Sequence, residues 1–360
     1  MTNLLIFAAG IAGLIAGAEL LVRGASKLAL SFGLSPLVVG LTIVAFGTSA
    51  PELAVSVGAV ASGQTDIAIG NVVGSNVLNV LLILGVSAVI TPLAVNVQLI
   101  RQEAPIMIGA AVLLLVFAID GTVRWYEAAV LCAGMVAYTV FLIVQSRRAG
   151  SGAGGSYDTG VAPAKTGAWD ARWWVQLLLI AAGMALLVGG AQALVHAAVA
   201  FAQMLGQSDV VIGLTVVALG TSMPEIATSL MAAFKGERDM AVGNVVGSNT
   251  FNILGCIGIS GLVAGSQGLQ VPAPVLHFDL WVMVAVSLAC LPVFISGREI
   301  ARWEGAVFVG YYLAYTTYLV LAAQHHAAAL SAFSTVMLSF VVPLTVVTMV
   351  VVMVRGSGKR

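Results

Sequence analysis

The sequence predicts an all-α, polytopic membrane protein built from two inverted five-helix repeats, giving ten core helices, with an eleventh helix at the C-terminus. The first observation behind this is composition: 60% of the 360 residues are hydrophobic and only 8% are charged, whereas about a quarter are charged in a soluble domain. The second is an internal duplication. The motif that starts at Gly40 recurs at Gly213, and the motif that starts at Gly70 recurs at Gly243, both with a shift of 173 residues.

Apolar runs long enough to cross a bilayer as helices recur along the whole chain. They predict eleven spans, at residues 4–22, 37–61, 67–90, 106–119, 125–143, 174–200, 211–234, 240–264, 280–295, 304–322 and 333–354. The first five spans form one copy of the duplicated unit and the next five form the other. Because five is odd, the second copy must enter the membrane from the opposite side, so the repeats are inverted about an axis in the membrane plane.

This arrangement divides the chain into four parts. Residues 1–145 form the first repeat (helices 1–5), and residues 173–322 form the second (helices 6–10). Between them, residues 146–172 include a Gly/Ser-rich stretch and are expected to be a flexible cytoplasmic linker. Residues 323–360 add the extra C-terminal helix and a basic tail.

The basic residues predict the orientation in a cell inner (plasma) membrane. With the N-terminus outside, fourteen of the 15 Lys and Arg residues fall on the cytoplasmic side, and Arg124 alone falls outside. Cytoplasmic loops of membrane proteins are enriched in Lys and Arg. The C-terminus is therefore expected in the cytoplasm.

The first duplicated motif places a carboxylate in the middle of a span. In Gly47-Thr-Ser-Ala-Pro-Glu52 the proline has no N–H and its ring clashes with the carbonyl of Gly47, so the helix should break there and free carbonyl oxygens around Ala45, Gly47 and Thr48. Gly220-Thr-Ser-Met-Pro-Glu225 repeats these elements. A charge at the centre of a bilayer costs about 2.5–3.5 kcal/mol or more, so each carboxylate needs a ligand, a partner or a proton.

The second motif supplies a polar helix face beside it. Asn71, Ser75 and Asn79 are four residues apart, as are Asn244, Ser248 and Asn252 in the second copy. Such polar side chains often only join membrane helices together, so alone they would indicate packing. Beside two deep carboxylates they indicate a site of hard oxygen ligands, which suits Na⁺, Ca²⁺ or Mg²⁺ better than a transition metal.

The two motif pairs resemble the alpha-repeats of the calcium/cation antiporter superfamily, specifically its prokaryotic sodium/calcium exchanger branch. The resemblance covers residues 1–322 and implies that Glu52 and Glu225 are shared central ligands. It further implies backbone oxygens from Thr48 and Thr221, and completion of the centre by Asn79 and Asn252. For the sodium sites it implies Ser49, Ser75, Ser222, Ser248 and the carbonyls of Ala45 and Ala218. Many members carry Asp where this chain has Asn79 or Asn252, so the fixed charge here is at most −2.

The resulting expectation is a secondary-active sodium/calcium antiporter that exports Ca²⁺ in exchange for Na⁺ by alternating access. A proton/calcium antiporter remains the alternative, and a cation channel is a further one. No catalytic dyad lies at depth, so we expect no enzyme activity and no cofactor. The expected partners are the lipid bilayer and the ions Ca²⁺ and Na⁺, with H⁺ in the alternative, but no nucleic acid and no protein.

Overall fold

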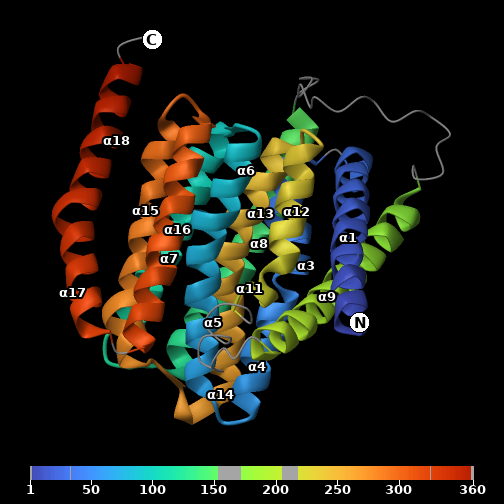
Figure 1. Ribbon diagram of the computed structural model, residues 1–360. Coiled ribbons are helices and arrows are strands. Elements are labelled where there is room, and N and C mark those ends of the chain that lie inside the picture. Colours follow the sequence, from blue (N-terminus) through green and yellow to red (C-terminus); the bar gives the residue numbers. More distant parts are fainter. Residues whose placement is uncertain (1, 33, 153–171, 205–217, 325, 358–360) are drawn as a thin grey trace.

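The computed structural model of the chain describes residues 2–32, 34–152, 172–204, 218–324 and 326–357. The described residues form a bundle of long helices with four two-residue strands (Figure 1). In Figure 1, helix α1 begins in the lower part of the bundle, and the last helix, α18, ends at the top. The all-α fold expected from the sequence is confirmed.

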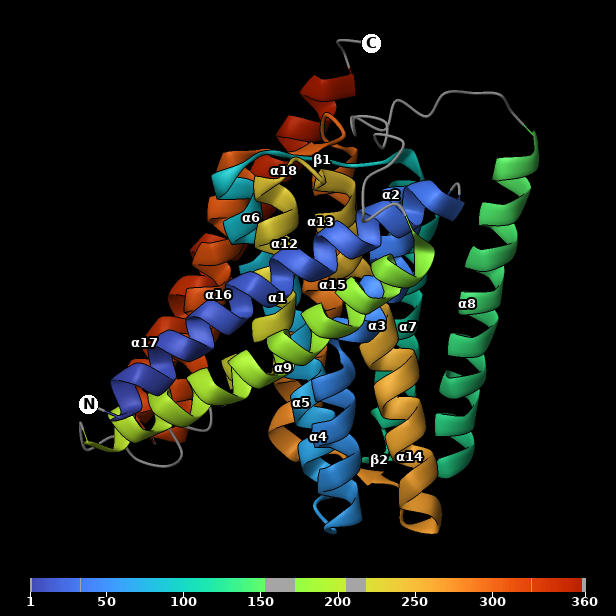
Figure 2. The same ribbon diagram turned by 90° about the vertical axis from the view of Figure 1, so that its right-hand side faces the viewer.

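Two long helices lie side by side across one face of the bundle. They are α1 (Thr2–Phe32) and α9 (Trp173–Met204), the first helix of each repeat, and both slant relative to the upright helices behind them (Figure 2). Their contacts pair Gly10 with Gly190 and Gly17 with Gly183, so the two helices run antiparallel with their backbones touching. Small residues at these positions allow this close approach.

The second helix of each repeat is broken. In the first repeat, α2 (Pro36–Val39), the π-turn η1 (Gly40–Val44) and α3 (Ala45–Thr48) lead to α4 (Ala50–Ala61), with a bend of 41° at the break. In the second, α11 (Ala218–Thr221) leads to α12 (Met223–Phe234). The beginning of the expected span 211–234, up to residue 217, lies outside the described residues.

The third helix of each repeat is continuous but widens at equivalent points. Helix α5 (Thr65–Leu78) passes through the π-turn η2 (Asn79–Leu84) into α6 (Gly85–Ile90). Helix α13 (Arg238–Phe251) passes through η6 (Asn252–Ile257) into α14 (Gly258–Ala264). The π-turns thus begin at Asn79 and Asn252, two of the expected ligands. Wide turns of this kind are frequent at functional sites.

The fourth and fifth helices interlock the repeats. The fourth are η3 (Leu99–Glu103) with α7 (Ala104–Ala118), and η8 (Val275–Asp279) with α15 (Leu280–Ile295); the fifth are α8 (Trp125–Gly152) and α16 (Arg302–Ala323). Helix α8 packs on α14 and η6 of the other repeat, and α16 packs on α6 and η2. Helix α8 also extends through residues 146–152, which were expected to begin the linker; residues 153–171 of that segment lie outside the described residues.

Short strand pairs join the repeats at opposite ends of the bundle. Strand β1 (Leu93–Ala94) pairs antiparallel with β4 (Glu299–Ile300), and β2 (Thr122–Val123) pairs with β3 (Leu269–Gln270). The connection between helices 3 and 4 of one repeat therefore meets the connection between helices 4 and 5 of the other, as inverted repeats require. From β1 to β3 the shift is 176 residues (93 to 269) rather than 173, and a 3-10 turn, η7 (Gly265–Gln267), precedes β3.

The C-terminal segment lies at the edge of the bundle. It consists of α17 (Ala327–Val336), the π-turn η9 (Met337–Val341) and α18 (Val342–Ser357). Neither α17 nor η9 has a buried residue. Among the described residues nine helices are long and apolar enough to span a membrane, and the broken helix from Pro36 to Ala61 makes a tenth.

Two buried carboxyl–tyrosine pairs occupy equivalent places in the repeats. Tyr138 Oη donates to Glu103 Oε2 at 2.6 Å, and Tyr315 Oη donates to Asp279 Oδ1 at 2.8 Å. Each carboxylate ends the π-turn that opens its fourth helix, and each tyrosine lies on the fifth helix. Each pair therefore ties these two helices together.

Replacing Tyr138 by Phe is expected to destabilise the fold. It removes a donor to a fully buried carboxylate, and hydrogen bonds to charged groups contribute about 1.5–3 kcal/mol. Thermal unfolding of the purified protein in detergent measures the loss. Tyr311→Phe is the control, because Tyr311 donates to the neutral Thr345 hydroxyl. Equal melting temperatures for the two variants would contradict the stabilising role assigned to the Glu103 bond.

Candidate ion-binding site

The two carboxylates lie at equivalent helix starts in the middle of the bundle. Glu52 is in the first turn of α4 and Glu225 in the first turn of α12, and both side chains are fully buried. Ser222 Oγ donates to Glu52 Oε1 at 3.1 Å, and Ser49 Oγ donates to Glu225 Oε1 at 3.0 Å. Each carboxylate is therefore held by the serine at the helix break of the other repeat. Neither half of this arrangement is complete without the other.

The prolines set where the helices restart. Ser49 (φ −82°, ψ 2°) and Ser222 (φ −88°, ψ 7°) leave the helical conformation, and Pro51 and Pro224 then lie in the first turns of α4 and α12. Proline is well tolerated there because the first N–H groups of a helix have no partner within it. The expectation of a freed Ala45 carbonyl is corrected: it accepts from Ser49 N at 3.0 Å. Because Pro51 has no N–H, the carbonyl of Gly47 loses the donor that a helix would supply four residues later. The carbonyl of Ala45 keeps its donor, the N–H of Ser49.

Three oxygens around this centre are buried without a hydrogen-bond partner within the described part of the chain: Glu52 Oε2, Glu225 Oε2 and Asn79 Oδ1. Unpaired buried polar atoms are costly. Oxygen ligands of this kind suit Na⁺ or Ca²⁺. Within the same described ranges no cluster of three or more His, Cys, Asp or Glu side chains could hold a metal. The donor set is thus two carboxylates with amide and hydroxyl oxygens.

Further hydroxyls surround the carboxylates. Ser222 Oγ also lies 3.3 Å from Ser75 Oγ. Thr48 Oγ1 lies 3.4 Å from Ser248 Oγ and donates to Asn244 Oδ1 at 3.2 Å. The structure therefore joins seven of the expected residues in hydrogen-bonded contacts: Glu52, Glu225, Ser49, Ser222, Ser75, Thr48 and Ser248.

The remaining expected ligands are placed less directly. Ala45 is buried in α3. Thr221 is half-buried at the end of α11, and that helix begins at Ala218, for which only the backbone is described. Asn79 and Asn252 are fully buried and reach amides of the opposite repeat. The roles of all these residues as ion ligands remain predictions.

Several polar residues next to the site were not among the predicted ion ligands, although Asn71 and Asn244 were predicted to lie on the polar helix face. Asn71 Nδ2 donates to the Glu52 carbonyl at 3.2 Å and to Ser56 Oγ at 3.1 Å. In the other repeat, Asn244 Nδ2 donates to Ser229 Oγ at 2.8 Å. Asn76 and Asn249 also contact the expected ligands. Asn76 and Asn249 are identical in the two motif copies, which was an available signal, but they lie off the helix face defined by residues 71, 75 and 79.

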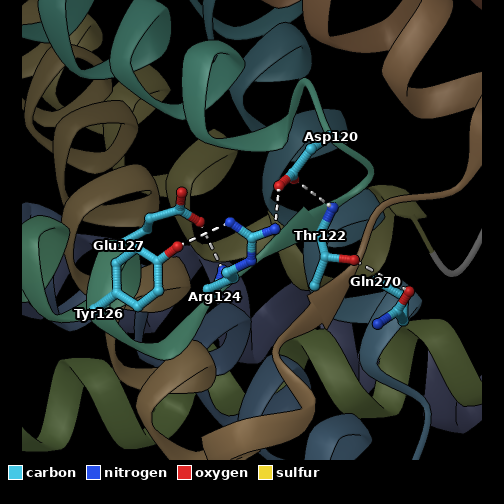
Figure 3. Close-up of polar contacts among 6 residues, drawn as sticks. All are labelled: Asp120, Thr122, Arg124, Tyr126, Glu127 and Gln270. Carbon is cyan, nitrogen blue, oxygen red and sulfur yellow. Dashed lines mark hydrogen bonds and ion pairs between the residues drawn. The ribbon is translucent and has the colours of Figure 1, made fainter.

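A polar hollow of about 350 Å³ at the β2–β3 end is separate from this centre. Figure 3 shows Arg124 in an ion pair with Asp120 at 2.7 Å and donating to Tyr126 Oη at 2.8 Å, while Thr122 Oγ1 donates to Gln270 Oε1 at 3.4 Å. Asp120 is the one carboxylate among the described residues that line this hollow, and it is paired with Arg124. We assign no cation site to it.

Inverted repeats that meet at buried ionisable groups define the architecture of a secondary transporter. The chain belongs to the sodium/calcium exchanger family: the family model described as "Sodium/calcium exchanger protein" matches residues 2–144 and 175–321. This confirms the resemblance found in the sequence, and the family is one of transporters.

Known relatives agree with this assignment. The putative antiporter CaxA of Alkalimonas amylolytica is 38% identical over 255 residues, covering 68% of this chain and 77% of its own. The sodium/calcium exchanger MaX1 of Methanosarcina acetivorans is 35% identical over 346 residues, covering 88% and 98%. A solved structure of the sodium-calcium exchanger NCX_Mj superposes with a TM-score of 0.73 at 30% identity, covering 86% of this chain and 96% of that one.

Proposed function

We propose that the protein is a sodium/calcium antiporter that exports Ca²⁺ in exchange for Na⁺. The observation that carries the proposal is the pair of buried carboxylates, each bonded by a serine of the other repeat and each with an unpaired oxygen. Their combined charge of −2 equals the charge of one Ca²⁺ ion. The family and the relatives named above support cation/calcium exchange.

In this proposal both ions use one centre. Carboxylate, hydroxyl and amide oxygens bind either Na⁺ or Ca²⁺, so the two ions compete for Glu52 and Glu225. The empty centre would carry two unbalanced charges in a low-dielectric interior, which opposes its passage between the two sides of the membrane. Only the ion-loaded protein then changes readily between the states in which the centre is open to one side of the membrane or to the other. This makes the movement of one ion depend on the return of the other.

Uptake of ⁴⁵Ca²⁺ into proteoliposomes tests the proposal. An outwardly directed Na⁺ gradient, with pH equal on both sides, is expected to drive Ca²⁺ accumulation. A proton gradient without Na⁺ is expected to drive none. Accumulation with the proton gradient alone would establish the proton/calcium alternative, and calcium-dependent conductance without counterflow would establish a channel.

We also propose that the N-terminus is outside and the C-terminus is in the cytoplasm. Arg298 and Arg302 flank the β1–β4 pair, while Arg124 follows β2 at the opposite end. The Lys/Arg-rich end should face the cytoplasm. A reporter active only in the cytoplasm, fused after Arg360, is expected to be active. A well-expressed but inactive fusion would mean that the chain crosses the membrane ten times or has the opposite orientation.

A further inference from the structure

Four buried amides form a network between the third helices of the two repeats, α5–η2 and α13–η6. Each repeat contributes equivalent bonds. Asn79 Nδ2 donates to Asn249 Oδ1 at 2.9 Å, and Asn252 Nδ2 donates to Asn76 Oδ1 at 3.3 Å. All four side chains are at most 2% exposed. Since Asn79 and Asn76 belong to one repeat and Asn252 and Asn249 to the other, both bonds cross between the repeats.

These bonds determine which end of each ligand amide is free. The Nδ2 groups of Asn79 and Asn252 are used as donors across the interface. Asn79 Oδ1 is left without a partner in the described chain, and Asn252 Oδ1 has only the weak Cys256 thiol at 3.6 Å. A cation binds the oxygen of an amide and is repelled by its NH₂ group. The network therefore leaves the cation-binding end of each amide available.

The free oxygens belong to the ion-binding centre. Asn79 is one helical turn from Ser75, which contacts Ser222 and, through it, Glu52. Asn252 is one turn from Ser248, which contacts Thr48. Each amide thus lies one helical turn from a serine of the carboxylate centre.

Asn76 and Asn249 are themselves held in one orientation. Asn76 Nδ2 donates to the Asn249 carbonyl at 3.4 Å, and Asn249 Nδ2 donates to the Asn76 carbonyl at 3.3 Å. Each Nδ2 also faces a methionine sulfur, Met283 Sδ at 3.6 Å and Met107 Sδ at 3.7 Å. With their NH₂ groups fixed on these acceptors, their Oδ1 atoms must face the ligand amides. Turning either amide over would break three contacts, two made by its Nδ2 and one accepted by its Oδ1.

We propose that Asn76 and Asn249 are positioning residues, each of which holds the ligand amide of the opposite repeat with its oxygen toward the transported ion. This rests on the proposed function, since it requires that the centre bind cations. Residues that orient metal ligands typically change metal affinity by about 10- to 100-fold when replaced. The same dependence is expected here, and it makes each half of the site rely on the other repeat.

The test is a double-mutant cycle on equilibrium ⁴⁵Ca²⁺ binding by the full-length protein in detergent, without Na⁺. Asn249→Leu is expected to raise the half-saturating Ca²⁺ concentration about 10- to 100-fold. In the Asn79→Leu background the same replacement should change it less than about threefold, because Asn249 then has no ligand amide to orient. Thr250→Val is the matched control, since the hydrogen bond that this buried hydroxyl makes among the described residues goes to the Val246 carbonyl of the same helix; it should bind as the parent does.

Three results would contradict the positioning role, and the last of them would also contradict the proposed function. Unchanged Ca²⁺ binding by Asn249→Leu would overturn the positioning role. Effects of Asn249→Leu and Asn79→Leu that multiply independently would indicate general disruption and overturn it as well. A parent protein that binds no Ca²⁺ would overturn the proposed function together with this inference. Asn76→Leu, measured against Asn252→Leu, repeats the cycle on the other half and decides the matter if one variant does not fold.

Discussion

Replacing Glu225 by Gln is expected to abolish sodium-driven Ca²⁺ transport. The amide keeps the shape of the side chain and an oxygen that can accept from Ser49, so folding should be retained. The centre, however, loses one of its two charges. Removing one partner of a buried charge interaction costs about 2–5 kcal/mol or more, which corresponds to roughly a thirtyfold to several thousandfold loss of affinity.

Because the arrangement is symmetric, Glu52→Gln is expected to have the same effect. Initial rates of ⁴⁵Ca²⁺ counterflow in proteoliposomes, at matched amounts of inserted protein, measure both variants. Glu127→Gln, at the exposed start of α8, is the control and should transport at the parental rate. Near-normal counterflow in either Glu52→Gln or Glu225→Gln would show that the two carboxylates are not shared ligands.

Replacing Gly183 by Val is expected to disrupt the crossing of α1 and α9. A Cβ atom at Gly183 would lie 2.6 Å from Leu21 N and 2.8 Å from the Gly17 carbonyl oxygen. These are backbone atoms, so the helices themselves would have to separate. Overpacking typically costs about 1–3 kcal/mol. Both helices pack on α12, whose first turn holds Glu225, so we expect a lower melting temperature and a reduced flux.

The same helix provides a control. Nothing in the described structure comes within 4 Å of a Cβ atom built at Gly189, so Gly189→Val should fold and transport as the parent does. Thermal unfolding and flux are measured on the two variants side by side. A Gly183→Val protein that matches Gly189→Val in both would contradict the close backbone packing of α1 on α9.

The duplication allowed much of the fold to be predicted, because the repeated motifs divide the ten core helices into two equivalent sets of five. Helix ends were predicted less well. The apolar run of the first span ends at Val22, yet α1 continues through Arg23 and Lys27 to Phe32. An apolar run ends at a charged residue, but a helix can continue past it, since long basic side chains can direct their charges toward water.

The centre of the site was predictable for a physical reason. A carboxylate beside a proline in an apolar span is too costly without a function, so Glu52 and Glu225 stand out. The amide network was not predictable, because the partners of Asn76 and Asn249 lie on another helix of the opposite repeat. The Glu103 and Asp279 pairs were missed for a different reason: the shift between repeats grows by three residues before Asp279, which hides the equivalence.

In the proposed mechanism, Na⁺ and Ca²⁺ compete for one pair of carboxylates, Glu52 and Glu225. Equilibrium binding of ⁴⁵Ca²⁺ to the purified protein at a series of Na⁺ concentrations, at constant ionic strength with choline replacing Na⁺, tests it most directly. Na⁺ is expected to raise the half-saturating Ca²⁺ concentration without changing the number of Ca²⁺ sites. The increase should be steeper than first order in Na⁺, because one monovalent ion cannot balance the charge of −2. Calcium binding that is unaffected by Na⁺ would contradict the claim.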